Sequence, residues 1–472
     1  MTDRYDLLIL GAGSTAFAAA LKAAELGRTA VMTERRTVGG TCVNRGCLPS
    51  KDLIEAARIY WEAGRPRFPG LGGKTLDLDF GRLIAGKDEL IREYRAKHYN
   101  SIVDESERIS IMKGHARLID AHSLALDGRR LEGEQVLVAT GSRPAVPNIP
   151  GLDEVPYLTS DLLTSEEPIE LTDQPRSLAI IGGGYIALEL AQLFQRLGTP
   201  VTIIQRSPAL LADYEPEVRA EIEQVLSDEG VEVRLGARVR AVRRADDGVE
   251  VALDDSEVRA HRLLIATGRT PNTDDLGLES AGVTLDERGF VRVDDQLRTN
   301  VANIWAAGDV VTGQLGAQMA TPVGAHDGNI AAGNALGEEP RTVDHRVLPR
   351  TIFTDPQIAT IGLTDEAAKR AGYRCSCNTV PMELVPRAGA IRDERGLIKM
   401  VADAENSRVL GVSMVGRDAG EVIHEAAMGM RFGAKLHDFI DMVHVYPTMA
   451  EALKIVALSF YKDVSKMSCC AE

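Results

Sequence analysis

The chain has 472 residues, of which 44% are hydrophobic, 26% charged and 4% aromatic, and its formal net charge is −15. This composition indicates an ordinary globular protein of about three domains and excludes a disordered or fibrous one. The acidic balance disfavours nucleic acid and anionic membranes as partners, because both repel a negatively charged surface.

The apolar stretch 7–26 is interrupted by Lys22 and broken by two glycines. It therefore predicts neither a signal peptide nor a membrane span, and we expect the protein to be cytoplasmic.

Residues 5–34 predict a strand, a glycine-rich turn, a helix and a second strand. Gly11 allows the tight turn, Gly13 lets the backbone approach a pyrophosphate, and Ala16 permits close helix packing. The helix N-terminus faces the phosphates. Glu34 ends the second strand, where a carboxylate accepts hydrogen bonds from a ribose diol. The stretch therefore predicts a dinucleotide site.

The six cysteines form three close pairs, and the first pair lies in the segment 39–51, GGTCVNRGCLPSK. We expect Cys42 and Cys47 at the start of one helix, whose dipole stabilises a thiolate. Lys51 follows Cys47 by four residues, so it shares a helical face with that thiol and adds positive charge. The pattern indicates a redox-active dithiol that closes into a disulfide and reopens.

The strand–turn–helix–strand pattern recurs over residues 177–204. Two such units, each in the correct frame, predict two dinucleotide sites. The second turn carries the same pattern of small residues at Gly182, Gly184 and Ala187. Gln205 and Arg206 then stand where an acid would select an unphosphorylated ribose. A cation there suits a 2′-phosphate, so the sequence favours NADPH over NADH.

Repeated Thr-Gly segments and a proline-rich connection predict the domain layout. Residues 137–142 and 264–269 each predict a buried strand that ends in Thr-Gly, and residues 304–309 predict a strand that returns the chain to the first domain. After about residue 344 the pattern becomes α+β. The predicted parts are a first dinucleotide domain (1–150), a second one (151–275), a return to the first (276–343), an α+β domain (344–465) and an exposed tail (466–472).

With these motifs in place, the chain resembles the flavin-dependent pyridine nucleotide–disulfide oxidoreductases over essentially its whole length. The resemblance implies an α/β fold with two Rossmann-like domains, for FAD and NAD(P)H, and a C-terminal dimerisation domain. It implies a homodimer in which each active site uses the partner's C-terminal domain. It places FAD at Gly11, Gly13, Glu34 and Asp309, and NAD(P)H at Gly182, Gly184 and Ala187. We also assign cofactor contacts to Ala16, Gly40, Thr41, Thr140, Gly141, Gln205, Arg206 and Gly268.

The same resemblance implies a role for each active-site residue. Cys42 is the interchange thiol, and Cys47 is the thiolate against the flavin. Lys51 pairs with Glu189 beside the flavin ring. Tyr185 is the gate where the nicotinamide enters.

The C-terminal segment departs from the pattern of the family's disulfide reductases, His-x-His-Pro-Thr-x-x-x-Glu. This chain has Tyr446 in place of the histidine before proline. A phenol titrates near pH ~10 and is a poor base for dithiol chemistry at neutral pH, which argues against lipoamide and glutathione as substrates. His444 lies two residues before Tyr446, and we expect that it does not replace the missing histidine. We assign Tyr446 a polar or gating role.

The tail ends in the adjacent thiols Cys469 and Cys470. Adjacent cysteines rarely form a disulfide with each other and are suited to capture a thiophilic cation. With this pair near the C-terminus and a tyrosine before proline, the chain resembles the mercuric reductases of the family. We therefore expect NADPH-dependent reduction of Hg(II) to Hg(0). The tail thiols of one subunit would capture Hg(II) from thiol complexes and pass it to Cys42 and Cys47 of the other.

Two alternatives stay open at this point. One is a dihydrolipoamide dehydrogenase-like disulfide reductase that uses His444. The other is a non-enzymatic flavoprotein that binds a soft metal without reducing it. Cys375 and Cys377 have no place in the resemblance. Their Cys-x-Cys spacing can bind a soft metal, but we interpret them as ordinary thiols on a strand or loop.

Overall fold

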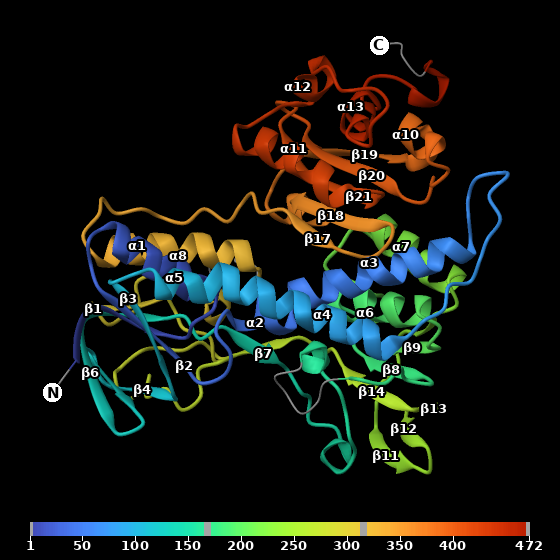
Figure 1. Ribbon diagram of the computed structural model, residues 1–472. Helices are drawn as coiled ribbons and strands as arrows, with labels where there is room; N and C mark the ends of the chain where they lie inside the picture. The colour runs from blue at the N-terminus through green and yellow to red at the C-terminus, as the bar shows by residue number, and fades with distance from the viewer. Residues whose placement is uncertain (1–2, 165–170, 312–318, 469–472) are drawn as a thin grey trace.

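The computed structural model describes residues 3–164, 171–311 and 319–468, and its largest sheet has seven strands (Figure 1). Five of its strands run parallel to one another, and the other two continue the sheet antiparallel. The strands, in spatial order, are β3 (Ile109–Lys113), β2 (Ala30–Glu34), β1 (Asp3–Leu10), β6 (Arg129–Val138), β5 (Ser123–Leu126) and β4 (Ala116–Asp120), with β16 (Ile304–Ala306) beside β6. Strand β16 pairs with β6, so residues 304–306 belong to the sheet that contains β1.

Two helices, α1 (Ser14–Glu25) and α8 (Thr321–Ala335), pack side by side against this sheet (Figure 1). Small residues allow their close approach: a Cβ at Gly328 would lie 2.3 Å from the carbonyl oxygen of Thr15. This packing brings residues more than 300 positions apart to the first glycine-rich turn and sets the N-terminus of α8 beside it.

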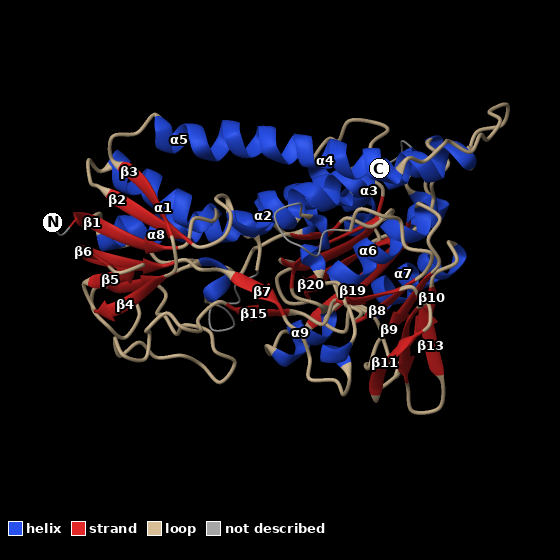
Figure 2. Ribbon diagram, turned by 60° about the horizontal axis from the view of Figure 1, so that its bottom comes forward, coloured by secondary structure: helices blue, strands red, loops and turns tan. Residues whose placement is uncertain are grey.

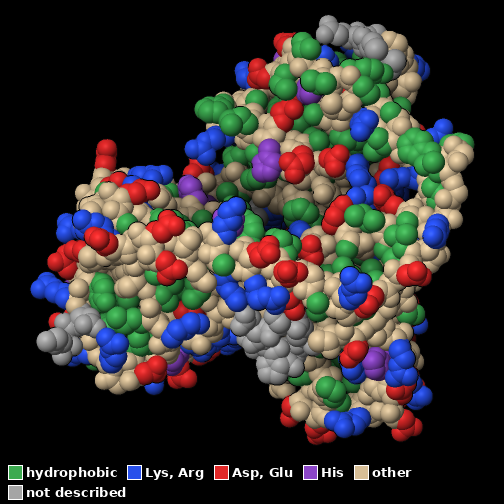
Figure 3. Space-filling model, in the orientation of Figure 1, with side chains coloured by type: hydrophobic (Ala, Val, Ile, Leu, Met, Phe, Trp, Pro, Cys, Tyr) green, Lys and Arg blue, Asp and Glu red, His purple; other side chains and the backbone are tan. Residues whose placement is uncertain are grey.

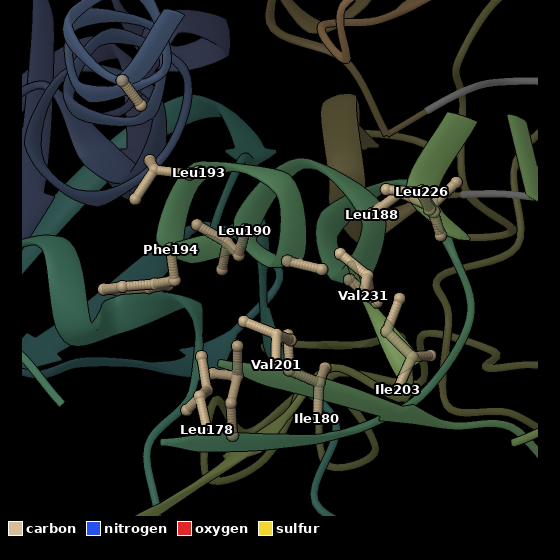
Figure 4. Close-up of a cluster of buried hydrophobic side chains, with 14 of the residues drawn as sticks. Leu178, Ile180, Leu188, Leu190, Leu193, Phe194, Val201, Ile203, Leu226 and Val231 are labelled. Carbon is tan, nitrogen blue, oxygen red and sulfur yellow. The ribbon is translucent and has the colours of Figure 1, made fainter. Parts of the chain in front are cut away.

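The second glycine-rich turn belongs to a four-stranded parallel sheet. Its strands, in spatial order, are β10 (Glu232–Arg234), β9 (Val201–Ile204), β8 (Leu178–Ile181) and β14 (Arg262–Ile265), with helices α6 (Tyr185–Arg196) and α7 (Pro216–Asp228). Figure 4 shows side chains of α6, among them Leu190 and Phe194, above Leu178, Ile180 and Val201 of the sheet. This contact buries the apolar side of α6 and fixes the turn that precedes it.

Two smaller sheets complete the nucleotide-binding part. Strands β11 (Ala241–Ala245), β12 (Gly248–Ala252) and β13 (Glu257–Ala260) form an antiparallel sheet. Strands β7 (Ser142–Pro144) and β15 (Arg269–Pro271) pair antiparallel, and each directly follows a Thr-Gly segment. This short ribbon ties together the two places where the chain passes between the first and second sheets.

Helices α2 (Gly40–Arg45), α3 (Cys47–Gly64), α4 (Phe80–Arg95) and α5 (Ser101–Asp104) follow the first βαβ unit. A π-helical turn, Ala96–Asn100, joins α4 to α5, and Figure 2 shows this stretch as one long helical run. Helix α3 packs on both α4 and α6. The dithiol segment therefore lies where the first and second nucleotide-binding units meet.

The C-terminal part is a five-stranded antiparallel sheet with helices packed against it (Figure 1). Its strands, in spatial order, are β17 (Arg350–Ile352), β18 (Gln357–Gly362), β21 (Val409–Gly416), β20 (Leu397–Asp403) and β19 (Cys375–Pro381). Its helices are α9 (Asp365–Arg370), α10 (Pro386–Ala390), α11 (Ala419–Arg431), α12 (Leu436–Asp441) and α13 (Glu451–Leu458). The predicted α/β fold with two Rossmann-like units and a C-terminal α+β part is confirmed.

Short 3₁₀ turns link these elements, at Leu152–Glu154, Ser160–Leu163, Gly308–Val310, Met382–Leu384 and Val464–Lys466. Among the helices that the structure describes, none combines the length and the apolar character needed to cross a bilayer.

Candidate active site

The two thiols of the dithiol segment lie on two consecutive helices, not on one as predicted. Helix α2 carries Cys42, and α3 begins at Cys47. Gly46 separates the helices with a non-helical backbone, and a Cβ there would lie 3.0 Å from the carbonyl oxygen of Thr41. Glycine at this position lets the chain break and fold back closely. Each thiol is consequently placed by its own helix.

A buried asparagine holds α2 in place. The side-chain amide of Asn44 donates to the carbonyl oxygens of Val38 and Gly40 at 2.9 and 2.8 Å, and its oxygen accepts from Arg95 of α4 at 2.8 Å. Asn44 was not among the predicted site residues. In the sequence, Asn44 is only a polar residue between two cysteines, and a polar residue there could equally be exposed at the surface.

The surroundings of Cys47 favour a thiolate. Its sulfur is at the N-terminus of α3, and the hydroxyl of Thr321, the first residue of α8, lies 3.8 Å away. The hydrogen bond from the Cys42 thiol and the positive charge of Lys51 lower the pKa of Cys47 to about 6. The same hydrogen bond, together with burial, raises the pKa of Cys42. At neutral pH the pair is therefore one thiolate and one thiol.

The structure brings Lys51 and Glu189 together, although 138 residues separate them in the chain. The Lys51 Nζ donates to Oε2 of the buried Glu189 at 2.8 Å. Glu189 Oε1 accepts the backbone N–H of Phe353 at 2.8 Å, and Lys51 Nζ stands 4.7 Å from the centre of the Phe353 ring. Helices α3 and α6 and the end of β17 are thereby fixed relative to one another.

The first glycine-rich turn is shaped for a ligand backbone to approach it. Gly11 has φ +107°, and a Cβ there would lie 2.5 Å from the Ala139 carbonyl oxygen. The backbones of Gly13 and Gly40 almost touch, since a Cβ at Gly40 would lie 2.7 Å from the Gly13 Cα. Glu34 accepts the backbone N–H of Ala12 at 3.1 Å, which holds its carboxylate at the turn. These residues fit the adenosine and pyrophosphate parts of FAD.

Polar groups from the first Thr-Gly segment and from the 308–310 turn extend this cradle. Ser142 donates to Asp309 at 2.8 Å, and Arg269 donates to Ser142 at 2.7 Å. Burial raises the pKa of Asp309, while Arg269 opposes that effect. Gly141 has φ +68° and open space where a Cβ would stand, and the Thr140 hydroxyl donates to the Asn272 carbonyl oxygen at 2.7 Å.

Ser142, Arg269 and Thr321 are site residues that the sequence analysis missed. A signal existed for two of them, because Ser142 and Arg269 are the residues that follow the repeated Ala-Thr-Gly segments. Thr321 had a weaker signal, a threonine before proline at a helix start.

The second turn repeats the geometry of the first. Gly182 has φ +127°, and a Cβ there would lie 2.2 Å from the carbonyl oxygen of Ala266, the counterpart of Ala139. At Gly184 and Gly268 a Cβ would meet no atom within 4 Å, so both backbones face open space. The buried Ala187 lets α6 pack closely. The second cradle fits a dinucleotide in the same way as the first.

The remaining residues predicted at this cradle lie at its rim. The Gln205 side chain packs against Gly183, and Arg206 follows β9 with an exposed side chain. Tyr185, the first residue of α6, is 42% exposed. It interacts electrostatically with Arg269 and Asp309, so it stands between the two cradles.

In the C-terminal part, His444 and Tyr446 have different surroundings, although residues two apart on a regular strand would share a face. The His444 ring is buried, and its Nε2 lies 3.0 Å from Glu425 Oε1 of α11, an interaction that raises the pKa of the histidine. Tyr446 is 49% exposed. His444 is therefore committed to a contact inside its own domain.

Large exposed apolar side chains lie next to Tyr446 in the sequence and at the C-terminal end of α11. Met428, Phe432, Val443 and Val445 are each at least 61% exposed. Figure 3 shows hydrophobic side chains gathered on the surface of this part of the molecule. Exposed apolar surface of this kind is typical of a protein interface.

The other two cysteine pairs have different outcomes. Cys375 and Cys377 lie on β19, and both thiols donate to Asp365 Oδ1 at 3.1 Å. Burial and the neighbouring carboxylate raise the pKa of both thiols. Cys469 and Cys470 lie outside the described residues, so their predicted role stays a prediction.

Comparison with known proteins adds independent findings. A family model described as pyridine nucleotide-disulphide oxidoreductase matches residues 5–328, and one described as the dimerisation domain of the same class matches residues 348–457. The chain is 44% identical to a mercuric reductase of Streptomyces lividans, over 99% of this chain and 98% of that protein. It is 42% identical to a mercuric reductase of Staphylococcus aureus, over 99% of this chain and 84% of that protein.

Among solved structures, the chain is similar to the HOCl-induced flavoprotein disulfide reductase RclA from Escherichia coli. The TM-score is 0.86 with 31% sequence identity, over 97% of this chain and 100% of that one.

Proposed function

The chain belongs to the pyridine nucleotide-disulphide oxidoreductase family, and we propose that it is a mercury(II) reductase. In the proposed reaction, NADPH and Hg(II) give NADP⁺, Hg(0) and one proton, so two electrons pass from the nicotinamide to the metal. Bound FAD supplies the two-electron connection between the nicotinamide and the thiol-bound metal. The full-length similarity to proteins named mercuric reductase supports this substrate.

The observation that carries mercury over a disulfide substrate is the arrangement of the C-terminal segment. Tyr446 stands where the disulfide reductases of the family have a histidine, and His444 is engaged with Glu425. Reduction of a disulfide needs a base or acid that titrates near neutral pH. Exchange of Hg(II) between sulfur ligands does not need such an acid or base, because the metal itself replaces the proton on sulfur.

The asymmetric thiol pair supports a specific binding step. The Cys47 thiolate attacks an Hg(II) dithiolate complex, and Cys42 then replaces the second ligand. The products are Hg(II) bound by both cysteines, one free thiolate and one free thiol, which carries the proton that Cys42 gives up. When two electrons reach the metal, both Hg–S bonds break and the electron pairs of those bonds stay on sulfur.

Neighbouring residues keep the pair in its reactive state. Lys51, held by Glu189, compensates the negative charge on Cys47 before the metal arrives. Tyr185 at the rim of the second cradle acts as the gate for the nicotinamide. Arg206 binds the 2′-phosphate, which makes NADPH the preferred donor.

The dimerisation domain completes the assembly. We propose that Tyr446 and the tail of one subunit face the thiol pair of the other. Cys469 and Cys470 capture Hg(II) from small-thiol complexes and transfer it across the interface to Cys42 and Cys47. The exposed apolar side chains near Tyr446 support an interface at this surface. A reaction fed by NADPH and small thiols is suited to the cytoplasm.

The test is anaerobic NADPH oxidation after addition of Hg(II) with an excess of small thiol, while volatile Hg(0) is trapped. We expect one Hg(0) per NADPH oxidised. Binding of Hg(II) with neither signal would reject the proposal in favour of a metal-binding flavoprotein. Rapid turnover of lipoamide without mercury-dependent NADPH oxidation would reject it in favour of a disulfide reductase.

A further inference from the structure

Cys375 and Cys377, which the proposed reaction does not use, converge on one carboxylate. Both lie on the same face of β19, because side chains two residues apart on a strand point to the same side. Helix α9 begins at Asp365 above this face and is capped by the Thr364 hydroxyl, which accepts the Ala367 N–H at 3.2 Å. Both sulfurs lie 3.1 Å from Asp365 Oδ1.

We propose that Cys375, Cys377 and Asp365 form a second metal site, for a thiophilic divalent cation of the Zn(II) or Cd(II) type. The three ligand atoms lie within 4.8 Å of one another. In a tetrahedral zinc site with Zn–S bonds of about 2.3 Å, two sulfurs stand roughly 3.8 Å apart. The three atoms already lie within 4.8 Å of one another, so side-chain rotation can place them around one ion, and a water molecule would be the fourth ligand.

The local charges suit a divalent cation. Two thiolates and one carboxylate carry three negative charges, and the metal carries two positive ones. Lys369, four residues after Asp365 on α9, donates to Asp365 Oδ2 at 2.8 Å. Its charge brings the total for the loaded site to zero. Lys369 binds Oδ2 only, so Oδ1 remains directed toward the two sulfur atoms.

Strand geometry argues against the main competing role, a disulfide between the two thiols. Parallel side chains two residues apart on a strand keep their Cβ atoms roughly 6.5 Å apart. A disulfide needs a Cβ–Cβ distance of about 3.8 Å. The two sulfurs thus remain separate ligands, and a metal can bridge them where a covalent bond would distort β19.

The site has a structural consequence. Strand β19 is at the edge of the five-stranded sheet, and α9 packs on it. A metal bound by both elements would tie the helix to the edge strand, in a domain other than the one that carries Cys42 and Cys47. We infer that the metal stays bound without being reduced, and that the site works independently of the proposed mercury reaction.

The test uses the full-length, FAD-loaded, oxidised protein in a Cys469→Ser/Cys470→Ser background, titrated with Cd(II) alone. The thiolate-to-cadmium absorption band reports binding to sulfur. We expect one Cd(II) per chain. Adding Cys375→Ser/Cys377→Ser should abolish the band, and Asp365→Asn should weaken affinity by roughly tenfold or more. Ser376→Ala, on the exposed opposite face of β19, is the matched control and should change nothing.

A second measurement needs no substitution at the site. In the chain with its natural cysteines, bound Cd(II) should slow alkylation of Cys375 and Cys377, measured by mass spectrometry of the peptide that contains both. Equal cadmium binding with and without Cys375→Ser/Cys377→Ser, or unprotected thiols in the natural chain, would overturn the proposal. Because neither readout depends on NADPH or mercury turnover, the result is distinct from a test of the proposed reductase.

Discussion

Two cysteine pairs of this protein differ in what faces their sulfur atoms. Cys47 stands at a helix N-terminus beside Lys51 and accepts a hydrogen bond from Cys42, and its pKa is lowered. Cys375 and Cys377 stand on a strand and face the Asp365 carboxylate, and their pKa values are raised. Four residues separate the first two cysteines, and one residue separates the other two. Their chemistry is set by the charge and dipole of the neighbouring element.

The difference also separates two uses of sulfur. A pair with one thiolate at neutral pH is ready for ligand exchange and electron transfer. A pair that is protonated without metal, with a carboxylate as third ligand, suits retention of a cation.

Replacing Cys47 with serine should have the largest effect. We expect mercury-dependent NADPH oxidation to fall by at least about a thousandfold, because no thiolate remains to start the ligand exchange. The steady-state rate under anaerobic conditions measures this. Ser376→Ala is the control from the other pair's strand and should retain full activity. A loss smaller than about tenfold in Cys47→Ser would show that the pair is not the reducing centre.

Alkylation of the reduced protein should distinguish the pairs by pH. The pKa of Cys47, about 6, predicts a rate that rises through that pH and falls as the solution becomes more acidic. Cys375 and Cys377 should react only well above neutral pH. At pH 7 we expect Cys47 to react on the order of ten to a hundred times faster. Quantitative mass spectrometry of the two peptides measures both alkylation rates. Similar rates at pH 7 would show that the thiols of the two pairs do not differ in pKa as proposed.

Lys51→Met should raise the pKa of Cys47 and so make this thiol more like Cys375 and Cys377. Loss of the nearby positive charge removes one of the causes that lower the pKa of Cys47. We expect the midpoint of its alkylation profile to move upward by about one pH unit, which is a tenfold lower thiolate fraction in the acidic range. Lys74→Met, an exposed lysine in the loop after α3, is the control. An unmoved midpoint would mean that Lys51 does not stabilise the thiolate.

Gly46→Ala should have the smallest effect, because it perturbs only the break between α2 and α3. The added Cβ would lie 3.0 Å from the Thr41 carbonyl oxygen and 3.3 Å from the Cys42 Cα. We expect a loss of about 1 kcal/mol in the free energy of unfolding, measured by denaturant titration of the FAD-loaded protein. Gly86→Ala in α4 has open space for its Cβ and should be neutral or slightly stabilising.

Much of the fold follows from local patterns. The two glycine-rich turns, the strands on either side of them and the Thr-Gly segments were all predictable, because a tight turn before a helix constrains only a few adjacent residues. The place of Glu34 at the end of its strand follows from the same pattern. The helix break at Gly46 was missed, because a Cys-x₄-Cys spacing with proline nearby is compatible with one helix or with two.

The sequence by itself identified the residues on which the proposed chemistry rests: the thiols, the glycine-rich turns, the tyrosine before proline and the adjacent tail cysteines. Only the tertiary structure decided which charges those residues meet. Thr321 of α8 reaches Cys47, and Asp365 reaches the thiols of β19. The pairing of Lys51 with Glu189 was expected from the family resemblance and not from the spacing of the two residues, which are 138 positions apart. The pKa of a thiol depends on dipoles and charges within a few ångströms, and such neighbours come from helix and sheet packing rather than from adjacent positions in the chain.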